Sequence, residues 1–242
     1  MEIKQFANGE VLAQAAARRV VSLLRDDPSL VLGVPAGRTP IGVYAELARL
    51  NAAGEADFSR ATAFAVDEFV GIDATHPASF HRFIREHFVE PVGLPLERFH
   101  ALNGVALDLD VECERYEASI QHAGGIGLQL LGIGGNGHIG FNEPANALTG
   151  PTHRVTLLDG TRKASAPLFG GDVACVPHEA VTMGVGTILN AKVVILLAAG
   201  EHKAASVERM VRGSITPQMP ASFLQTHRAV EIYLDRAAAS RL

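Results

Sequence analysis

The chain has 242 residues, of which 48% are hydrophobic, and its formal net charge is −5. A chain of this length can bury a sizeable core, and because no Pro/Ser-rich or charged linker divides it, we expect one domain over residues 1–242. The negative charge and the lack of basic clusters argue against a nucleic-acid partner. The two cysteines exclude a disulfide scaffold, and without a signal peptide or a long apolar run we expect a cytoplasmic protein that does not enter a membrane.

Strand-like and helix-like patterns alternate along the chain. In chain order, the apolar spacing predicts a helix over residues 11–24, a strand over 30–34, a helix over 41–50, a strand over 61–66, a helix over 79–88, strands over 128–133 and 193–198, a helix over 203–212 and a strand over 227–234. Residues 236–242 form a short tail. This order predicts an α/β fold with a Rossmann-like, doubly wound and mostly parallel sheet that has helices on both faces.

Polar residues follow four of the predicted strands directly. They lie in residues 35–40, at Asp67, in residues 134–143 and at Lys203. Doubly wound sheets bind ligands at the carboxyl ends of their strands, so we expect these four segments to form one site. One such coincidence is common in loops, but four of them point to a small-molecule enzyme.

The loop after the first predicted strand has the features of an anion-binding turn. Glycine lets a ligand approach the backbone, and the free N–H groups of a helix start can hold an anion. The candidate substrate-binding residues here are Ala36, Gly37, Arg38 and Thr39. We expect Thr39 to be the N-cap of the next helix and Pro40 its first residue. An ordinary capped turn is the alternative interpretation.

Asp67 and Lys203 each follow a buried strand, and each has two interpretations. Asp67 is either the N-cap of a turn or a partly desolvated base with a raised pKa. Lys203 either reaches over the sheet edge to a phosphate or is an exposed cation at the start of a helix. Their position beside the other segments favours a catalytic role for Asp67 and a substrate-binding role for Lys203.

His138 lies in a glycine-rich segment, with Glu143 five residues later. Few bulky side chains surround this imidazole, and a nearby carboxylate is the usual way to hold a histidine in one tautomer, so we expect a catalytic pair. A metal site would need further ligands, and the sequence has no HxH, HExxH or CxxC pattern, so we expect no metal. Five other histidines are expected to be surface or packing residues: His76, His81, His87, His100 and His122.

At these residues the chain closely resembles the glucosamine-6-phosphate deaminase (isomerase) family. The string GHIGFNEP at residues 137–144 is specific to that family. Related 6-phosphogluconolactonases are expected to carry a GHTASLFP-like string at this place. The resemblance spans most of the chain, and its matching segments are residues 33–40, 66–71, 77–80, 102–104, 132–144 and 180–187 together with Lys203.

The resemblance implies a reaction that needs no redox cofactor and no metal. In this family a histidine supported by a glutamate opens the sugar ring, and these residues match His138 and Glu143. An aspartate, here Asp67, then moves a proton from C2 to C1 of the open amino sugar. The resulting imine is hydrolysed to fructose 6-phosphate and ammonium. The implied partner is a small phosphorylated amino sugar, with glucosamine 6-phosphate as the leading candidate.

The chain departs from the family pattern at two places in the expected site. Asn136 stands where many members have aspartate, and we expect it to support catalysis by hydrogen bonding, because it carries no charge. Pro167 stands where the family usually has a phosphate-binding arginine. Arg38, in the anion-binding loop, is the candidate that would replace that charge together with Lys203.

A third departure concerns regulation. The residues that form an allosteric sugar-phosphate site in hexameric members are replaced here by Asn146, Ala147, His153 and Val155. We therefore expect a monomer or a small homo-oligomer and not an allosteric hexamer.

Three alternative functions remain open from the sequence. A galactosamine-6-phosphate deaminase would use the same residues, because the orientation of one hydroxyl is read by the shape of the pocket. In a 6-phosphogluconolactonase, His138 would activate water and Asp67 would have no carbon proton to move. A non-catalytic sugar-phosphate sensor would need the anion-binding loop and Lys203 but none of the three catalytic candidates, so their joint presence favours an enzyme.

Overall fold

A seven-stranded parallel sheet forms the centre of the molecule. The computed structural model describes all residues 1–242, and the strands lie in the order β1-β10-β9-β6-β2-β3-β5. Every neighbouring pair in this sheet is parallel. The strands are β1 (Glu2–Phe6), β2 (Val31–Val34), β3 (Thr62–Ala65), β5 (Phe99–His100), β6 (Leu128–Leu131), β9 (Val193–Ala198) and β10 (Val230–Asp235).

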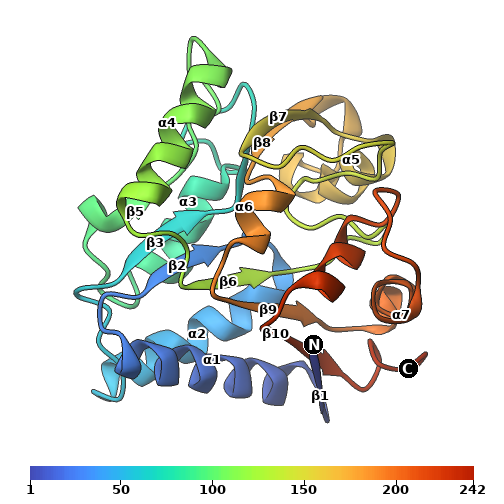
Figure 1. The fold of residues 1–242 in the computed structure, drawn as a ribbon. Helices are drawn as coiled ribbons and strands as arrows, with labels where there is room; N and C mark the ends of the chain where they lie inside the picture. The colour runs from blue at the N-terminus through green and yellow to red at the C-terminus, as the bar shows by residue number, and fades with distance from the viewer.

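Helices cover both faces of this sheet (Figure 1). They are α1 (Gly9–Asp26), α2 (Arg38–Ala52), α3 (Phe80–Ile84), α4 (Leu109–His122), α6 (Val185–Leu189) and α7 (Ala204–Arg212). A further helix, α5 (Asp159–Ser165), lies away from this sheet. A π-helical turn, Arg85–Val89, continues α3. No helix combines the length and the apolar character that crossing a membrane requires.

Alternating side chains of the central strands enter two separate cores. On β6, Leu130 belongs to the core beneath α1 and α2, and Leu131 belongs to the core beneath α4, α6 and α7. Ile195 and Leu196 alternate in the same way on β9. Because both faces are buried, these strands are apolar except for Gln129 in β6, as is typical of parallel sheets. The α/β fold with a doubly wound parallel sheet, expected from the sequence, is confirmed.

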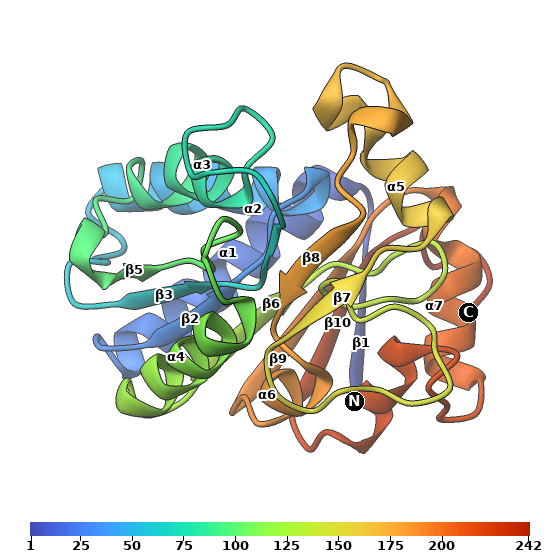
Figure 2. The same ribbon diagram turned by 90° about the horizontal axis from the view of Figure 1, so that it is seen from above.

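A smaller antiparallel sheet lies over the central strands, and the sequence patterns did not indicate it. It contains β4 (Asp67–Phe69), β8 (Glu179–Thr182) and β7 (His153–Thr156), in the order β4-β8-β7. Figures 1 and 2 show β7 and β8 above the parallel sheet. The backbone of Val66 joins the two sheets, because its N–H donates to Val34 O at 3.1 Å and its carbonyl accepts from Met183 N at 2.8 Å.

Two helix starts differ from the expectation. α2 begins at Arg38 and its N-cap is Gly37, so the prediction that Thr39 is the N-cap was wrong. The physical reason is that Gly37 has a φ of +126°, which glycine adopts readily, and the chain is therefore helical from the next residue. Lys203 ends the 3₁₀ turn Glu201–Lys203 and is the N-cap of α7, so the α-helix begins one residue later than expected.

Candidate active site

The four segments expected to form a site lie at the ends of four adjacent strands. β9, β6, β2 and β3 are neighbours in the sheet, and the chain runs from them to Lys203, to the His138 loop, to the Gly37 turn and to Asp67. The structure therefore brings the four segments to one edge of the sheet. This is the edge at which open α/β sheets bind their ligands.

Asp67 is a buried carboxylate without a partner. The residue is 7% exposed, and its side chain makes no hydrogen bond or ion pair within the chain. Two buried tyrosines approach it, but their hydroxyls donate elsewhere, Tyr44 to Pro35 O at 2.7 Å and Tyr116 to Ala65 O at 2.5 Å. The Asp67 oxygens are therefore available to a substrate.

The surroundings of Asp67 favour its protonated form. Burial, and then the neighbouring charge of Glu68, raises the pKa of Asp67 to about 8. A carboxyl group that titrates near neutral pH can accept a proton and return it. A base that serves two adjacent carbon atoms needs this property.

His138 and Glu143 lie in one loop after β6. His138 Nδ1 is 3.6 Å from Glu143 Oε2, which is within ion-pair range but too long for a hydrogen bond, and this nitrogen has no other partner. The imidazole lies against Gly134, where a Cβ atom would come within 2.4 Å of His138 Cε1. Only glycine at position 134 leaves room for the ring in this position.

Asn136 fixes this loop through both ends of its amide. Its Nδ2 donates to Glu143 Oε2 at 2.8 Å, and its Oδ1 accepts from the backbone N–H of His138 at 3.1 Å. An ionised aspartate could not donate to Glu143 in this way. Burial opposes ionisation of Glu143, but the neighbouring His138, Thr161 and Asn136 outweigh burial and lower the pKa of Glu143. The carboxylate beside His138 is therefore ionised.

β8 holds the His138 loop beside β4. Thr182 Oγ1 accepts from Phe141 N at 3.1 Å, and Asn142 Nδ2 donates to Met183 O at 2.8 Å. Thr182 is also the partner of Asp67 in the β4–β8 pairing. One strand thus joins the buried carboxylate to the His138 loop. Sequence reasoning assigned no role to Thr182, because Phe141 is 41 residues away and no local pattern links the two.

Lys203 and Arg38 are two cations at this edge. Lys203 Nζ donates to Ile133 O, after the end of β6, at 2.6 Å, and burial followed by the charge of Arg38 lowers the pKa of Lys203. Arg38 is exposed, forms no hydrogen bond or ion pair within the chain, and follows the turn at Ala36 and Gly37. α2 starts there without a side-chain cap, so its first N–H groups are free. Such a combination suits a phosphate.

Pro167 leaves no cation at the place where the family usually has an arginine. It is exposed in the 3₁₀ turn Ala166–Phe169. Arg162, one turn earlier, does not replace it, because the buried guanidinium donates from Nη2 to Val173 O at 2.9 Å and to Val176 O at 3.0 Å. Arg162 is a structural residue.

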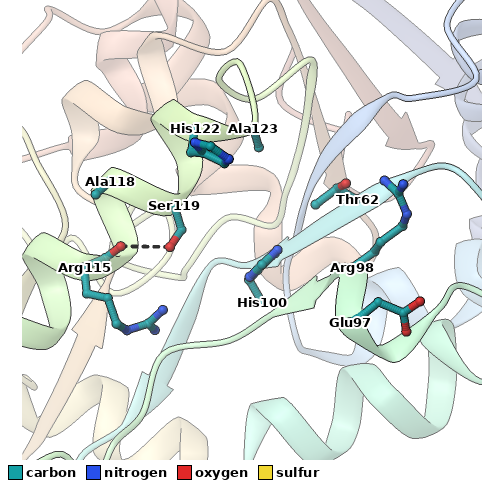
Figure 3. A pocket seen from close by; sticks show the side chains of 9 residues that line it. All are labelled: Thr62, Glu97, Arg98, His100, Arg115, Ala118, Ser119, His122 and Ala123. Carbon is teal, nitrogen blue, oxygen red and sulfur yellow. Dashed lines mark hydrogen bonds between the residues drawn. The ribbon is translucent and has the colours of Figure 1, made fainter.

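One cavity lies away from these residues. It has a volume of about 770 Å³ and is bounded by α4 and by residues of β3 and β5 (Figure 3). None of the predicted site residues lines it. Its two histidines have the packing and surface roles expected of them, because His100 stacks on Phe64 with ring centroids 4.5 Å apart and His122 is exposed. No group of three or more His, Cys, Asp or Glu side chains has a metal-binding arrangement.

Asp67→Asn should raise the melting temperature, and the gain should grow with pH. Folding raises the pKa of Asp67 from near 4 to about 8, so its contribution to stability is present in full below about pH 4 and is lost as the pH rises through about 8. Asparagine does not titrate, so the difference between variant and parent should increase over this range in thermal melts.

Asp26→Asn, at an exposed position, is the matched control for this measurement and should show no such trend. A difference between Asp67→Asn and the parent that stays constant from about pH 4 to about pH 8 would contradict a buried, unpaired carboxylate at position 67.

Comparisons with known sequences agree with this geometry. Residues 7–233 match the family model of the glucosamine-6-phosphate isomerases/6-phosphogluconolactonases. The chain is 43% identical over 236 residues to the glucosamine-6-phosphate deaminase of Streptomyces coelicolor, with 98% of this chain and 89% of that protein covered. It is 41% identical over 240 residues to the glucosamine-6-phosphate deaminase of a Thermoanaerobacter species, with 99% and 94% covered.

Solved structures have the same fold. A monomeric glucosamine-6-phosphate deaminase superposes with a TM-score of 0.96 at 38% identity, and all of both chains is covered. A 6-phosphogluconolactonase from Shewanella baltica superposes with a TM-score of 0.77 at 19% identity over 97% of each chain, which shows the shared fold alone. The chain therefore belongs to the glucosamine-6-phosphate isomerase/6-phosphogluconolactonase family.

Proposed function

We propose that the protein isomerises and deaminates glucosamine 6-phosphate, giving fructose 6-phosphate and ammonium. The observation that carries this proposal is the presence of two separate acid–base groups at one sheet edge. One is the buried, unpaired Asp67, and the other is His138 beside the ionised Glu143. The relatives at 41% and 43% identity are glucosamine-6-phosphate deaminases, which supports the same substrate here.

Ring opening is assigned to His138 and Glu143. Because His138 Nδ1 faces Glu143, the other ring nitrogen, Nε2, is the one available to the sugar. Nε2 accepts the proton of the C1 hydroxyl, the bond between C1 and the ring oxygen breaks, and the ring oxygen takes up a proton. Glu143, which Asn136 holds in place, stabilises the imidazole while it carries the proton.

Isomerisation is assigned to Asp67. Its carboxylate removes the proton from C2, the electron pair of that bond forms a double bond between C1 and C2, and the aldehyde oxygen is protonated. Asp67 then returns its proton to C1, which leaves an imine at C2. Water adds to the imine, and ammonium departs. A carboxyl group with a pKa of about 8 can hold the proton between the two steps.

A lactonase or a sensor would use only part of this site. A lactonase activates water but has no carbon proton for Asp67 to move, and a sensor needs no proton transfer. Galactosamine 6-phosphate would use every residue, because it differs from glucosamine 6-phosphate only in the orientation of one hydroxyl. An informative assay must therefore contain both amino sugars and the lactone.

Release of ammonium and formation of fructose 6-phosphate should be measured with glucosamine 6-phosphate, galactosamine 6-phosphate and 6-phosphogluconolactone. We expect turnover of glucosamine 6-phosphate. Asp67→Asn should lower kcat by about 10²–10⁴-fold with little change in KM, because it removes a general base. His138→Gln should also lower kcat strongly, and Glu143→Gln should lower it to a lesser degree.

His87→Gln, at an exposed position outside the site, is the matched control for His138→Gln and should leave turnover unchanged. Hydrolysis of the lactone without ammonium from either amino sugar would identify a lactonase instead. Near-normal activity of Asp67→Asn would remove this residue from the mechanism.

We also propose that Arg38 and Lys203 hold the substrate phosphate, with the N–H groups of the turn at Ala36, Gly37 and Thr39. Neither cation has a carboxylate partner, and Lys203 is anchored to the end of the central sheet. A guanidinium can grip two phosphate oxygens at once, whereas Lys203 supplies a point charge. Arg38 would thus replace the arginine that Pro167 displaces.

Arg38→Ala and Lys203→Ala should each raise KM for glucosamine 6-phosphate by about ten-fold or more, since a hydrogen bond to a charged group contributes about 1.5–3 kcal/mol. Lys192→Ala, an exposed cation outside the site, is the control. A large rise for Lys203→Ala beside an unchanged KM for Arg38→Ala would reject the role of Arg38. Unchanged values for both variants would mean that the phosphate is bound elsewhere.

We further propose a monomer or small homo-oligomer without allosteric activation. The usual allosteric residues are replaced, and the solved relative with a TM-score of 0.96 is a monomeric deaminase. Rates should rise hyperbolically with glucosamine 6-phosphate, and N-acetylglucosamine 6-phosphate should not increase them. Sigmoidal rates that the acetylated sugar converts to hyperbolic ones, or a hexamer in sedimentation velocity, would contradict this proposal.

A further inference from the structure

We propose that Glu68 is a positioning residue for Asp67, which fixes the reactive carboxylate by clamping the start of α3 against β4. The proposal rests on the proposed function, in which Asp67 is the base. Both residues lie in β4 and are buried, Asp67 at 7% and Glu68 at 2% exposure. Their surroundings differ completely, because Asp67 accepts no hydrogen bond from the chain and Glu68 accepts four.

The four donors to Glu68 come from both sides of the clamp. Glu68 Oε1 accepts from Phe69 N at 2.9 Å and from Phe80 N at 3.1 Å. Glu68 Oε2 accepts from Ser79 Oγ at 2.7 Å and from His81 N at 2.9 Å. One donor belongs to β4 and three belong to the first residues of α3 or to its cap. The carboxylate therefore links the strand and the helix directly.

The helix at the other side of the clamp is anchored in the core. Ser79 is fully buried and is the N-cap of α3, where its hydroxyl accepts from Arg82 N at 3.3 Å. Ile84 and Phe88, in α3 and the π turn that follows, are buried in the core that α1 and α2 also enter. Since the helix is held by this core, Glu68 ties β4 to a rigid part of the molecule. A negative charge at the helix start is itself favourable.

The same carboxylate acts on the charge state of Asp67. Consecutive strand residues point to opposite sides, so Glu68 faces α3 while Asp67 faces away from it. The groups around Asp67 are Thr182 across the sheet, Tyr44 from α2 and Tyr116 from α4, and none is a cation. After burial, the charge of Glu68 is what raises the pKa of Asp67. Removing that charge should therefore let Asp67 ionise at lower pH.

The decisive experiment is the pH profile of kcat/KM for Glu68→Gln with glucosamine 6-phosphate. Glutamine keeps the shape but loses the charge, and it cannot accept four hydrogen bonds. We expect kcat to fall by about ten-fold or more, because a small misplacement of a reacting group is costly, and KM to change less. We also expect the acidic limb of the profile, where Asp67 becomes ionised, to move to lower pH by at least about half a unit.

Two further variants separate position from charge. Glu68→Asp keeps the charge but shortens the side chain, so it should lower kcat and leave the acidic limb near that of the parent. Ser79→Ala removes one donor and retains the charge, so it should lower kcat several-fold with the same limb. The proposal would be overturned if Glu68→Gln lowered the melting temperature but left kcat and the acidic limb of the pH profile as in the parent. The Glu68 carboxylate would then have a structural role only. If Glu68→Gln does not fold, a parental kcat in Ser79→Ala overturns it.

A measurement without turnover distinguishes this proposal from the proposed function. The pH-dependent gain in melting temperature from Asp67→Asn should be smaller in the Glu68→Gln background than in the parent, because the neighbouring charge is gone. If the gain is smaller in the Glu68→Gln background but the parent protein releases no ammonium from glucosamine 6-phosphate, the deaminase function is rejected and the coupling of the two carboxylates is retained. An equal gain in both backgrounds would reject the coupling, whatever the activity.

Discussion

The site depends on the backbone of Val66, which hydrogen-bonds to both sheets at once. Its N–H continues the parallel pairing with Val34 of β2, and its carbonyl accepts from Met183, directly after β8. With both groups used, the chain leaves the parallel sheet at the next residue, Asp67. The carboxylate therefore lies where the parallel sheet ends and the antiparallel sheet begins. β2, the neighbour of β3, and β6, the neighbour of β2, end at the same edge and lead to the Gly37 turn and the His138 loop.

The absence of a hydrogen-bond partner for the buried Asp67 carboxylate lowers the stability of the fold. A buried carboxylate without a donor keeps its proton up to unusually high pH, whereas its neighbour in the same strand is fully hydrogen-bonded. Packing alone does not explain why one acid has four donors and the next has none. A fold that satisfies Glu68 and leaves Asp67 unpaired sacrifices stability at one reactive group, which is typical of functional sites.

The four strand ends could be predicted because each polar segment follows an apolar run, and such runs mark buried strands. The small sheet could not be predicted in this way, since β4 has only three residues, two of them acidic, and its partner β8 is distant in the chain. The helical spacing of Cys113, Tyr116 and Ile120 is a local signal from which α4 could also be predicted. Two further features could not be predicted from the sequence. The N-cap at Gly37 instead of Thr39 depends on the backbone angle of Gly37, and the hydrogen bond from Asn136 to Glu143 depends on the distance between the two side chains.

Proline at position 167 also changes where positive charge for a phosphate can come from. An arginine there would lie on the 3₁₀ turn after α5. At its other end, α5 contacts the His138 loop through its N-cap, because Leu158 N donates to Glu143 Oε1 at 3.2 Å. Arg38 and Lys203 instead stand at the ends of β2 and β9, and Lys203 is tied to Ile133 beyond β6. These strands belong to the rigid sheet that also carries the His138 loop. A phosphate bound by Arg38 and Lys203 would therefore set the distance between the sugar and its acid–base groups through the sheet itself, without relying on the position of α5.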